Sequence, residues 1–242
     1  MFSKYRLLSL KSLAFFLIFT SFLSCEEDVF IAFSETNILV EKETTVEINI
    51  PKAEGDKPIC DKINASLQGF VIQALNIDSA SDHAASIKES IAQFDTAYTT
   101  FKSKLPIEIK QDLTPWEASI EGEVAYESNH IICIAMNKYL NTGGVHGTAK
   151  VSFMNFDPKT GHTLQYKDFV KDTVDLRKFL KFQFEKAVEP IAYENFKLPE
   201  TIGFNDEGVV ILYNVNEMPA YTDRLTEFTV PYKDIKKYLK FD

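Results

Sequence analysis

The chain has 242 residues, of which 45% are apolar and 25% are charged, as in ordinary globular proteins. Its 20 Phe and 10 Tyr residues offer ample apolar surface to bury, which excludes a disordered chain. The formal net charge of −9 argues against nucleic acid as a partner, because phosphate binding requires clustered Lys and Arg.

Residues 1–24 are predicted to be the signal peptide of a lipoprotein. Three positive charges precede an uncharged apolar stretch from Ser12 to Leu23. This stretch is shorter than the roughly 20 residues that span a bilayer, but it matches the core of a signal peptide. The Ser24-Cys25 pair that follows resembles a lipobox, in which the cysteine becomes the lipidated first residue. An ordinary cleaved signal peptide, with Cys25 present by chance, is the alternative.

The predicted location is therefore the outer membrane or surface of a bacterium, with the chain anchored in the membrane through lipid on Cys25. The acidic residues 26–28 resemble the tracts that follow the lipidated cysteine in some surface lipoproteins. Removal of residues 1–24 takes the formal charge from −9 to −12, since the segment holds three Lys or Arg and no acid. An acidic exported domain favours basic partners through long-range attraction.

The first half of the mature chain alternates strands with helices. Residues 26–40 are predicted to be an acidic lead-in followed by a strand, and residues 45–51 alternate as a half-buried strand does. Asp61 is predicted to cap a helix whose apolar face runs from Ile63 to Ala74. A second helix, with apolar residues from Ile87 to Phe101, is expected after Ser81.

Strands dominate the second half. Apolar and small residues from Trp116 to Tyr126 share one parity, while Glu117, Ser119, Glu121 and Glu123 occupy the other. Further strands are predicted at 130–136, 148–156, 209–213 and 227–230, with turns at 157–161 and 205–208 and helices at 174–188 and 232–239. Helices grouped apart from runs of strands predict an α+β fold with antiparallel sheets and packed helices.

Cys60 and Cys133 are the two cysteines left after processing. In an oxidising compartment they can pair as a disulfide. Cys133 lies in the apolar run 131–134, where a buried free thiol is equally natural.

The most distinctive segment is Tyr-Leu-Asn-Thr-Gly-Gly-Val-His-Gly at residues 139–147. It is followed by a strand, the Asp-Pro-Lys-Thr-Gly turn at 157–161, and Leu-Gln-Tyr-Lys-Asp-Phe at 164–169. This order resembles the paired extracytoplasmic domains of the anti-sigma factor RsiV and the related N-terminal module of the peptidoglycan deacetylase PdaC. The resemblance spans most of residues 30–242.

The resemblance implies two abutting subdomains, a PdaC-like one at 25–158 and one at 159–242 like the C-terminal domain of RsiV. It also implies a ligand, because the sensing domain of RsiV binds lysozyme, a basic protein. An anti-sigma role is not expected, since only residues 1–11 precede the apolar core. The catalytic domain of PdaC is a separate metal-dependent module with paired His ligands, and this chain has no His-x-x-x-His. Neither an enzyme nor a metal or other cofactor is therefore predicted.

The predicted ligand-binding residues are Tyr139, Gly143, Gly144, His146 and Gly147. The glycines let backbone approach closely, so that a ligand can dock beside the imidazole. In the alternative interpretation the glycines only form a tight connection and His146 bonds a neighbouring strand. Glu121 and Glu123 are interpreted as a solvated strand face. Trp116, Tyr126 and Tyr139 are candidates for a sugar-binding surface, with core packing as the default.

Together these observations predict a non-enzymatic binding module of the bacterial envelope, with a lysozyme-like protein as its ligand. The alternative is a protein that binds or modifies peptidoglycan, in association with deacetylation. A structural lipoprotein without a small ligand is the third possibility.

Overall fold

The computed structural model describes residues 29–77, 84–144, 146–188, 196–218 and 225–241. The predicted signal peptide, Cys25 and Ser81 lie outside the described residues. Ile31–Asp242 form one compact unit, which holds all the helices and strands named below. No helix among the described residues is long and apolar enough to cross a membrane.

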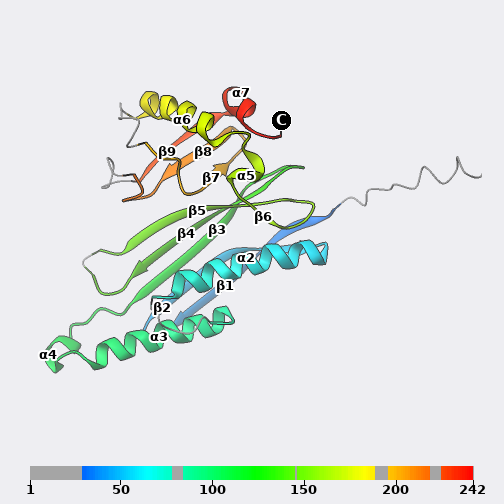
Figure 1. Cartoon of the computed structure of the whole chain (residues 1–242). Helices are drawn as coiled ribbons and strands as arrows, with labels where there is room; N and C mark the ends of the chain where they lie inside the picture. Colours follow the sequence, from blue (N-terminus) through cyan, green and yellow to red (C-terminus); the bar gives the residue numbers. More distant parts are fainter. Residues whose placement is uncertain (1–28, 78–83, 145, 189–195, 219–224, 242) are drawn as a thin grey trace, which may run out of the picture. The chain divides into compact units, whose positions relative to one another are not determined.

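The compact unit combines two sheets with helices (Figure 1). The chain begins with β1 (Ile31–Glu41), β2 (Thr45–Gly55), α2 (Lys57–Leu75), α3 (Ile87–Ser103) and α4 (Ile107–Lys110). They are followed by β3 (Glu117–Glu127), β4 (Ile132–Asn141), β5 (Thr148–Phe156), β6 (Thr163–Leu164), α5 (Tyr166–Phe169) and α6 (Thr173–Ala187). The chain closes with β7 (Ile202–Phe204), β8 (Gly208–Tyr213), β9 (Thr226–Pro231), α7 (Tyr232–Ile235) and a 3-10 turn, η3 (Lys236–Tyr238).

The large sheet has the strand order β1-β2-β3-β4-β5-β6, and the small sheet has the order β7-β8-β9. All neighbouring strands are antiparallel except β2 and β3, which are parallel. A parallel pair needs a crossover connection, and α2, α3 and α4 lie in this one. The α+β class is confirmed, and the prediction of antiparallel sheets holds apart from this pair.

Helices α2 and α3 cover one face of the large sheet and form the helix-side core with it (Figure 1). The predicted apolar face of α2 is confirmed, since Ile63, Leu67 and Val71 are buried. That of α3 is confirmed in its middle, where Phe94 and Tyr98 are buried, whereas Phe101 near its end is 38% exposed. The prediction that Asp61 caps α2 is wrong. Asp56 precedes the first helical residue, and Asp61 Oδ2 instead pairs with Lys57 Nζ at 2.7 Å. A proline is tolerated in the first turn of a helix, so Pro58 does not delay its start.

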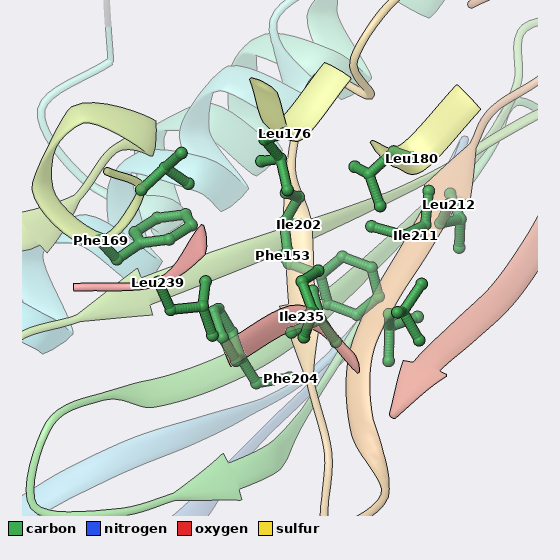
Figure 2. Close-up of a cluster of buried hydrophobic side chains, with 14 of the residues drawn as sticks. Phe153, Phe169, Leu176, Leu180, Ile202, Phe204, Ile211, Leu212, Ile235 and Leu239 are labelled. Carbon is green, nitrogen blue, oxygen red and sulfur yellow. The ribbon is translucent and has the colours of Figure 1, made fainter. Parts of the chain in front are cut away.

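The small sheet packs on part of the opposite face of the large sheet and forms the second core, the small-sheet core. Figure 2 shows side chains of β5, β7, β8 and α6 meeting there. Phe153 of β5 lies directly under β7, because a Cβ placed on Gly203 would be 2.5 Å from its ring. Helix α6 closes the core with Leu176, Leu180 and Phe184, all completely buried.

A β-bulge in β3 changes which face its side chains occupy. The register with β4 shifts between Val124 and Tyr126, so that Ala125 has no partner opposite it. Val124 therefore packs in the helix-side core, whereas Tyr126 packs in the small-sheet core, 6.5 Å from the ring of Phe204. The strict alternation predicted from Trp116 to Tyr126 ends at this bulge.

Strands β4 and β5 contribute to both cores, because successive side chains of a strand point to opposite faces. Cys60 lies in the helix-side core and Cys133 in the small-sheet core, on opposite sides of the sheet. Both thiols are free. A disulfide between them is therefore not part of this fold. The predicted subdomain boundary at residue 158 stays a prediction.

Side chains hold the small sheet on the edge of β5. The amide of Asn214 accepts a hydrogen bond from Val151 N at 2.8 Å and donates one to Val151 O at 2.9 Å. Thr201 Oγ1 accepts another from Phe153 N at 3.0 Å. These side chains satisfy backbone groups that a neighbouring strand would otherwise pair.

Candidate functional site

One part of the large sheet carries exposed acidic side chains on the face opposite α2 and α3. We call it the open acidic face. Its carboxylates come from three neighbouring strands, β1, β2 and β3, and all of them are exposed: Glu41, Glu47, Glu117, Glu121 and Glu123. None of the five forms an ion pair with another described residue.

The strand register places these carboxylates in rows across the sheet, because residues directly opposite each other share a face. In the first row Glu41 and Glu117 both lie opposite Thr45. In the second, Glu47 lies between Leu39 and Ser119. The third row contains only amides, a carboxylate and a valine, in the order Asn37, Asn49, Glu121, Asn137 and Val151.

A hollow of about 380 Å³ lies on the open acidic face, beside the small sheet. Its polar lining comes from Asn49, Glu121, Glu123 and Asn137. Val151, whose backbone is bonded to Asn214, lines its far side. Carboxylate oxygens and amide groups around such a hollow can bind an ammonium or guanidinium group, or the hydroxyls of a sugar.

The predicted glycine–histidine loop joins β4 to β5 at one end of this face. Tyr139 lies in the row of Glu47 and Ser119, and its ring passes so close to Gly147 that a Cβ there would overlap it. Gly143 has a φ of 89°, and its N–H bonds Asn141 Oδ1 at 3.1 Å. The loop therefore turns tightly and brings a half-buried tyrosine to the acidic rows.

Gly144 and His146 occupy the exposed tip of the same loop. A Cβ on Gly144 would lie 3.3 Å from the carbonyl oxygen of His146. The structure shows no hydrogen bond to the imidazole from the described residues, so His146 is available to solvent. The alternative interpretation, in which His146 bonds a neighbouring strand, finds no support among these contacts.

Two of the three aromatic residues considered for sugar binding are core residues. Trp116 is 7% exposed and packs against the rings of Phe94, Tyr98 and Phe101 at 5.5 to 5.8 Å. Tyr126 packs on the small-sheet core. Only Tyr139 reaches the open acidic face.

Metal-ligating side chains do not gather in the described part of the chain. No group of three or more His, Cys, Asp or Glu residues there is placed to hold a metal ion. His130 stacks on Phe241 at 5.6 Å, and His162 lies 3.2 Å from Lys62 Nζ. His130 and His162 are thus engaged at separate places on the surface.

Sequence reasoning missed Glu41 and the amides of the hollow as members of one site. The signal was present in part, because residues 45–51 and 117–123 each alternate polar with apolar side chains. The alternation within each segment does not reveal that β2 pairs with β3. That pairing joins two strands separated by three helices.

Residues 39–149 match the protein family described as "Deacetylase PdaC". The match confirms the predicted resemblance to the PdaC-type domain. It includes all five carboxylates of the open acidic face and the whole glycine–histidine loop. A comparison with curated proteins found no match.

Two solved structures share the fold. The chain is similar to a DUF3298 family protein from Pseudomonas aeruginosa PAO1, with a TM-score of 0.61 and 14% identity, over 89% of this chain and 96% of that one. It is also similar to a member of the same family from Bacteroides fragilis NCTC 9343, with a TM-score of 0.63 and 17% identity, over 88% of this chain and 94% of that one. At these identities the similarity establishes the fold.

Proposed function

We propose that this PdaC-like chain is a non-enzymatic binding protein of the bacterial envelope, and that its open acidic face captures a basic protein such as a lysozyme-like muramidase. The observation that carries the proposal is the set of five exposed carboxylates on three adjacent strands, none paired with a described cation. The charge of −12 after removal of residues 1–24 adds long-range attraction to the same partner.

Binding would use Lys and Arg side chains of the partner. A long basic side chain fits the hollow of about 380 Å³ and can bond Glu121, Glu123 and the flanking amides there. The remaining carboxylates would meet other basic groups in exposed ion pairs. Each such pair contributes only about 0.2–1 kcal/mol, so that affinity depends on several acting together.

The test is calorimetric titration of residues 26–242, which retain the whole compact unit, with hen lysozyme. The informative variant is the triple substitution E47Q/E117Q/E121Q. Its matched control is D206N/E207Q/D234N, which removes three exposed carboxylates outside the open acidic face. Glutamine and asparagine keep side-chain size and polarity, so that the two variants differ only in where charge is lost.

We expect saturable binding at about 0.02 M salt that is lost at about 0.5 M, because screening shortens the range of exposed charges to a few Å. The E47Q/E117Q/E121Q variant should bind lysozyme about tenfold more weakly than wild type, which is the loss expected for three exposed ion pairs. The affinity of the control variant should stay within about twofold of wild type. Absence of heat from the wild-type protein, or equal losses in both variants, would refute the proposal.

Peptidoglycan is the second candidate ligand, and a specific observation favours it. The hollow has amides on both sides of Glu121 and lies one row from Tyr139, a combination that suits the hydroxyl and acetamido groups of a sugar. Binding of soluble peptidoglycan fragments should then be nearly independent of salt. It should be weakened by Y139A, whereas lysozyme binding through charge should change little in that variant.

Attachment to the membrane is proposed through lipid on Cys25. Growth of an expressing bacterium with an alkyne-bearing palmitate should label the full-length protein and leave C25A unlabelled. Labelling of neither protein would argue instead for an ordinary cleaved signal peptide, and labelling of both would show that the lipid is not on Cys25.

A further inference from the structure

A second cavity, separate from the open acidic face, lies along the edge of β5. It has a volume of about 700 Å³, within the range of small-molecule sites. Its walls come from α2, β5, the β6–α5 segment and the residues around the start of β7. The cavity can form here because β6 pairs only with the last two residues of β5, which leaves the strand edge before them without a neighbouring strand.

The surface that a ligand can touch in this cavity is mainly apolar. Aromatic and aliphatic side chains of four elements line it and are only half-buried, so that part of each is accessible: Phe70, Met154, Leu164 and Tyr166. Three further apolar residues of the lining are at most 9% exposed and add little accessible surface: Phe153, Phe169 and Ile202. An alkyl chain that covers the accessible part removes apolar surface from water, which favours binding.

The charge at the margin of the cavity is positive. Among the described residues, the charged side chains that line the cavity are those of Glu200 and Lys167. Glu200 forms an ion pair with Lys150, whereas Lys167 forms none with a described residue. An exposed ammonium group without a carboxylate partner therefore lies beside the apolar surface.

A second ammonium group is held close to the first. Lys240 Nζ donates a hydrogen bond to the backbone oxygen of Lys167 and also forms no ion pair with a described residue. The nearest carboxylates along the chain, those of Asp168 and Asp172, do not line the cavity, and both accept hydrogen bonds from backbone N–H groups. The margin therefore favours an anionic group, which can form charge-assisted hydrogen bonds with an ammonium group.

We propose that this cavity binds a single-chain amphiphile with an anionic headgroup, of the fatty-acid class. Its alkyl chain lies on Phe70, Met154 and Leu164, and its carboxylate bonds Lys167 Nζ. Lys167 is exposed, so that the carboxylate reaches it without uncovering a buried group. This inference does not depend on the proposed function, because the open acidic face contributes none of these residues.

The probe for the test is cis-parinaric acid, a fluorescent fatty acid whose emission rises in apolar surroundings. It is titrated into residues 26–242 at about pH 7, where carboxylates are ionised, and then displaced with decanoate, 1-decanol or decyltrimethylammonium. These three competitors have the same alkyl chain and differ in the charge of the headgroup. The alcohol is the most apolar of them, so a preference for decanoate reports the ammonium group and not simple partitioning.

We expect saturable binding of the probe by the wild-type protein. Decanoate should displace it at about fivefold lower concentration than 1-decanol, which is the gain that one exposed ion pair allows. Decyltrimethylammonium should be the weakest competitor, because its charge has the same sign as that of Lys167.

The variant K167Q should abolish the preference for decanoate over 1-decanol, because glutamine keeps a polar side chain and removes the charge. The matched control is K88Q, which removes an exposed lysine of α3 that does not line the cavity and should keep the preference. Both lysines are exposed, and substitutions at such positions usually change stability little.

Two tryptophan variants locate the binding. Q73W places a large ring at the margin of the cavity, and Q68W places the same ring on an exposed position of α2 that does not line it. The affinity for the probe should fall at least about tenfold in Q73W, where the ring takes space from the ligand, and stay near that of wild type in Q68W. The proposal is overturned by the absence of saturable fluorescence from the wild-type protein, by equal displacement with decanoate and 1-decanol, by a preference for decanoate that K167Q retains, or by equal losses in Q68W and Q73W.

Discussion

Replacement of Asn214 by alanine tests how the small sheet is held on the large one. The Asn214 side chain makes two hydrogen bonds with the backbone of Val151, at 2.8 and 2.9 Å, and a third with Glu217 Oε2 at 3.2 Å. Asn214 itself is 7% exposed, so water does not replace these bonds in the folded protein without rearrangement. In N214A the N–H and C=O groups of Val151 both lose their partner.

Each lost bond removes about 0.5–1.5 kcal/mol, and an unsatisfied buried group costs about 1–3 kcal/mol. Val151 is half-buried, which lets water reach its backbone in part, and we therefore expect a total loss of about 2–3 kcal/mol. Urea unfolding followed by circular dichroism measures the free energy of unfolding directly. The melting temperature should fall by about 5–10 °C.

The matched control is N37A, which removes an amide from an exposed position of β1 and should change stability by at most about 0.5 kcal/mol. An N214A protein as stable as N37A would refute the argument, because it would show that the edge of β5 does not need the side chain. A lower slope of unfolding free energy against urea would instead indicate that the small sheet has detached.

Three further predictions concern the core, the thiols and acid stability. Phe184, completely buried against three aromatic rings, should cost about 3–5 kcal/mol when replaced by alanine, measured by urea unfolding. Burial raises the pKa of the Cys133 thiol to about 12 and also raises the pKa of the Cys60 thiol. Ellman's reagent should therefore label neither cysteine in the native protein and both cysteines in urea. Labelling of Cys133 before unfolding would contradict its burial. Two backbone N–H groups of α6 hold the pKa of Asp172 below its ordinary value of 3.8. The Asp172 carboxylate therefore stabilises the fold above pH 3.8, and this stabilisation is lost as the pH falls through the lower pKa of the folded state. The difference in unfolding free energy between wild type and D172N should narrow as the pH falls below 3.8, and a constant difference would count against this cap.

Local patterns in the sequence predicted most of the helices and strands. The alternation of residues 45–51 identified β2, and the spacing of apolar residues identified α3 and α6. The turn at 157–161 was also correct, since Gly161 N bonds Asp157 O at 2.8 Å. These features depend on side-chain periodicity and on turn chemistry, which neighbouring residues determine.

The features of the fold that local patterns did not predict depend on pairing between strands that are distant in the sequence. The sequence predicted that Glu121 and Glu123 share a solvated face, but only the parallel pairing of β2 with β3 brings Glu47 into the row next to Glu121. The bulge at Ala125 likewise could not be predicted from the sequence, because it is defined by the register between β3 and β4. No local pattern encodes which strand lies opposite a given residue.

The candidate sites show the same division. The sequence alone determined that the chain is acidic, that it contains the glycine–histidine loop of a PdaC-like domain, and that its strands carry exposed carboxylates. Only the tertiary structure decided that these carboxylates form one open face, that Cys60 and Cys133 lie in separate cores, and that Lys167 lies at the margin of an apolar cavity. The physical reason is that charge and periodicity belong to single segments, whereas faces, cores and cavities form only where segments distant in the chain pack together.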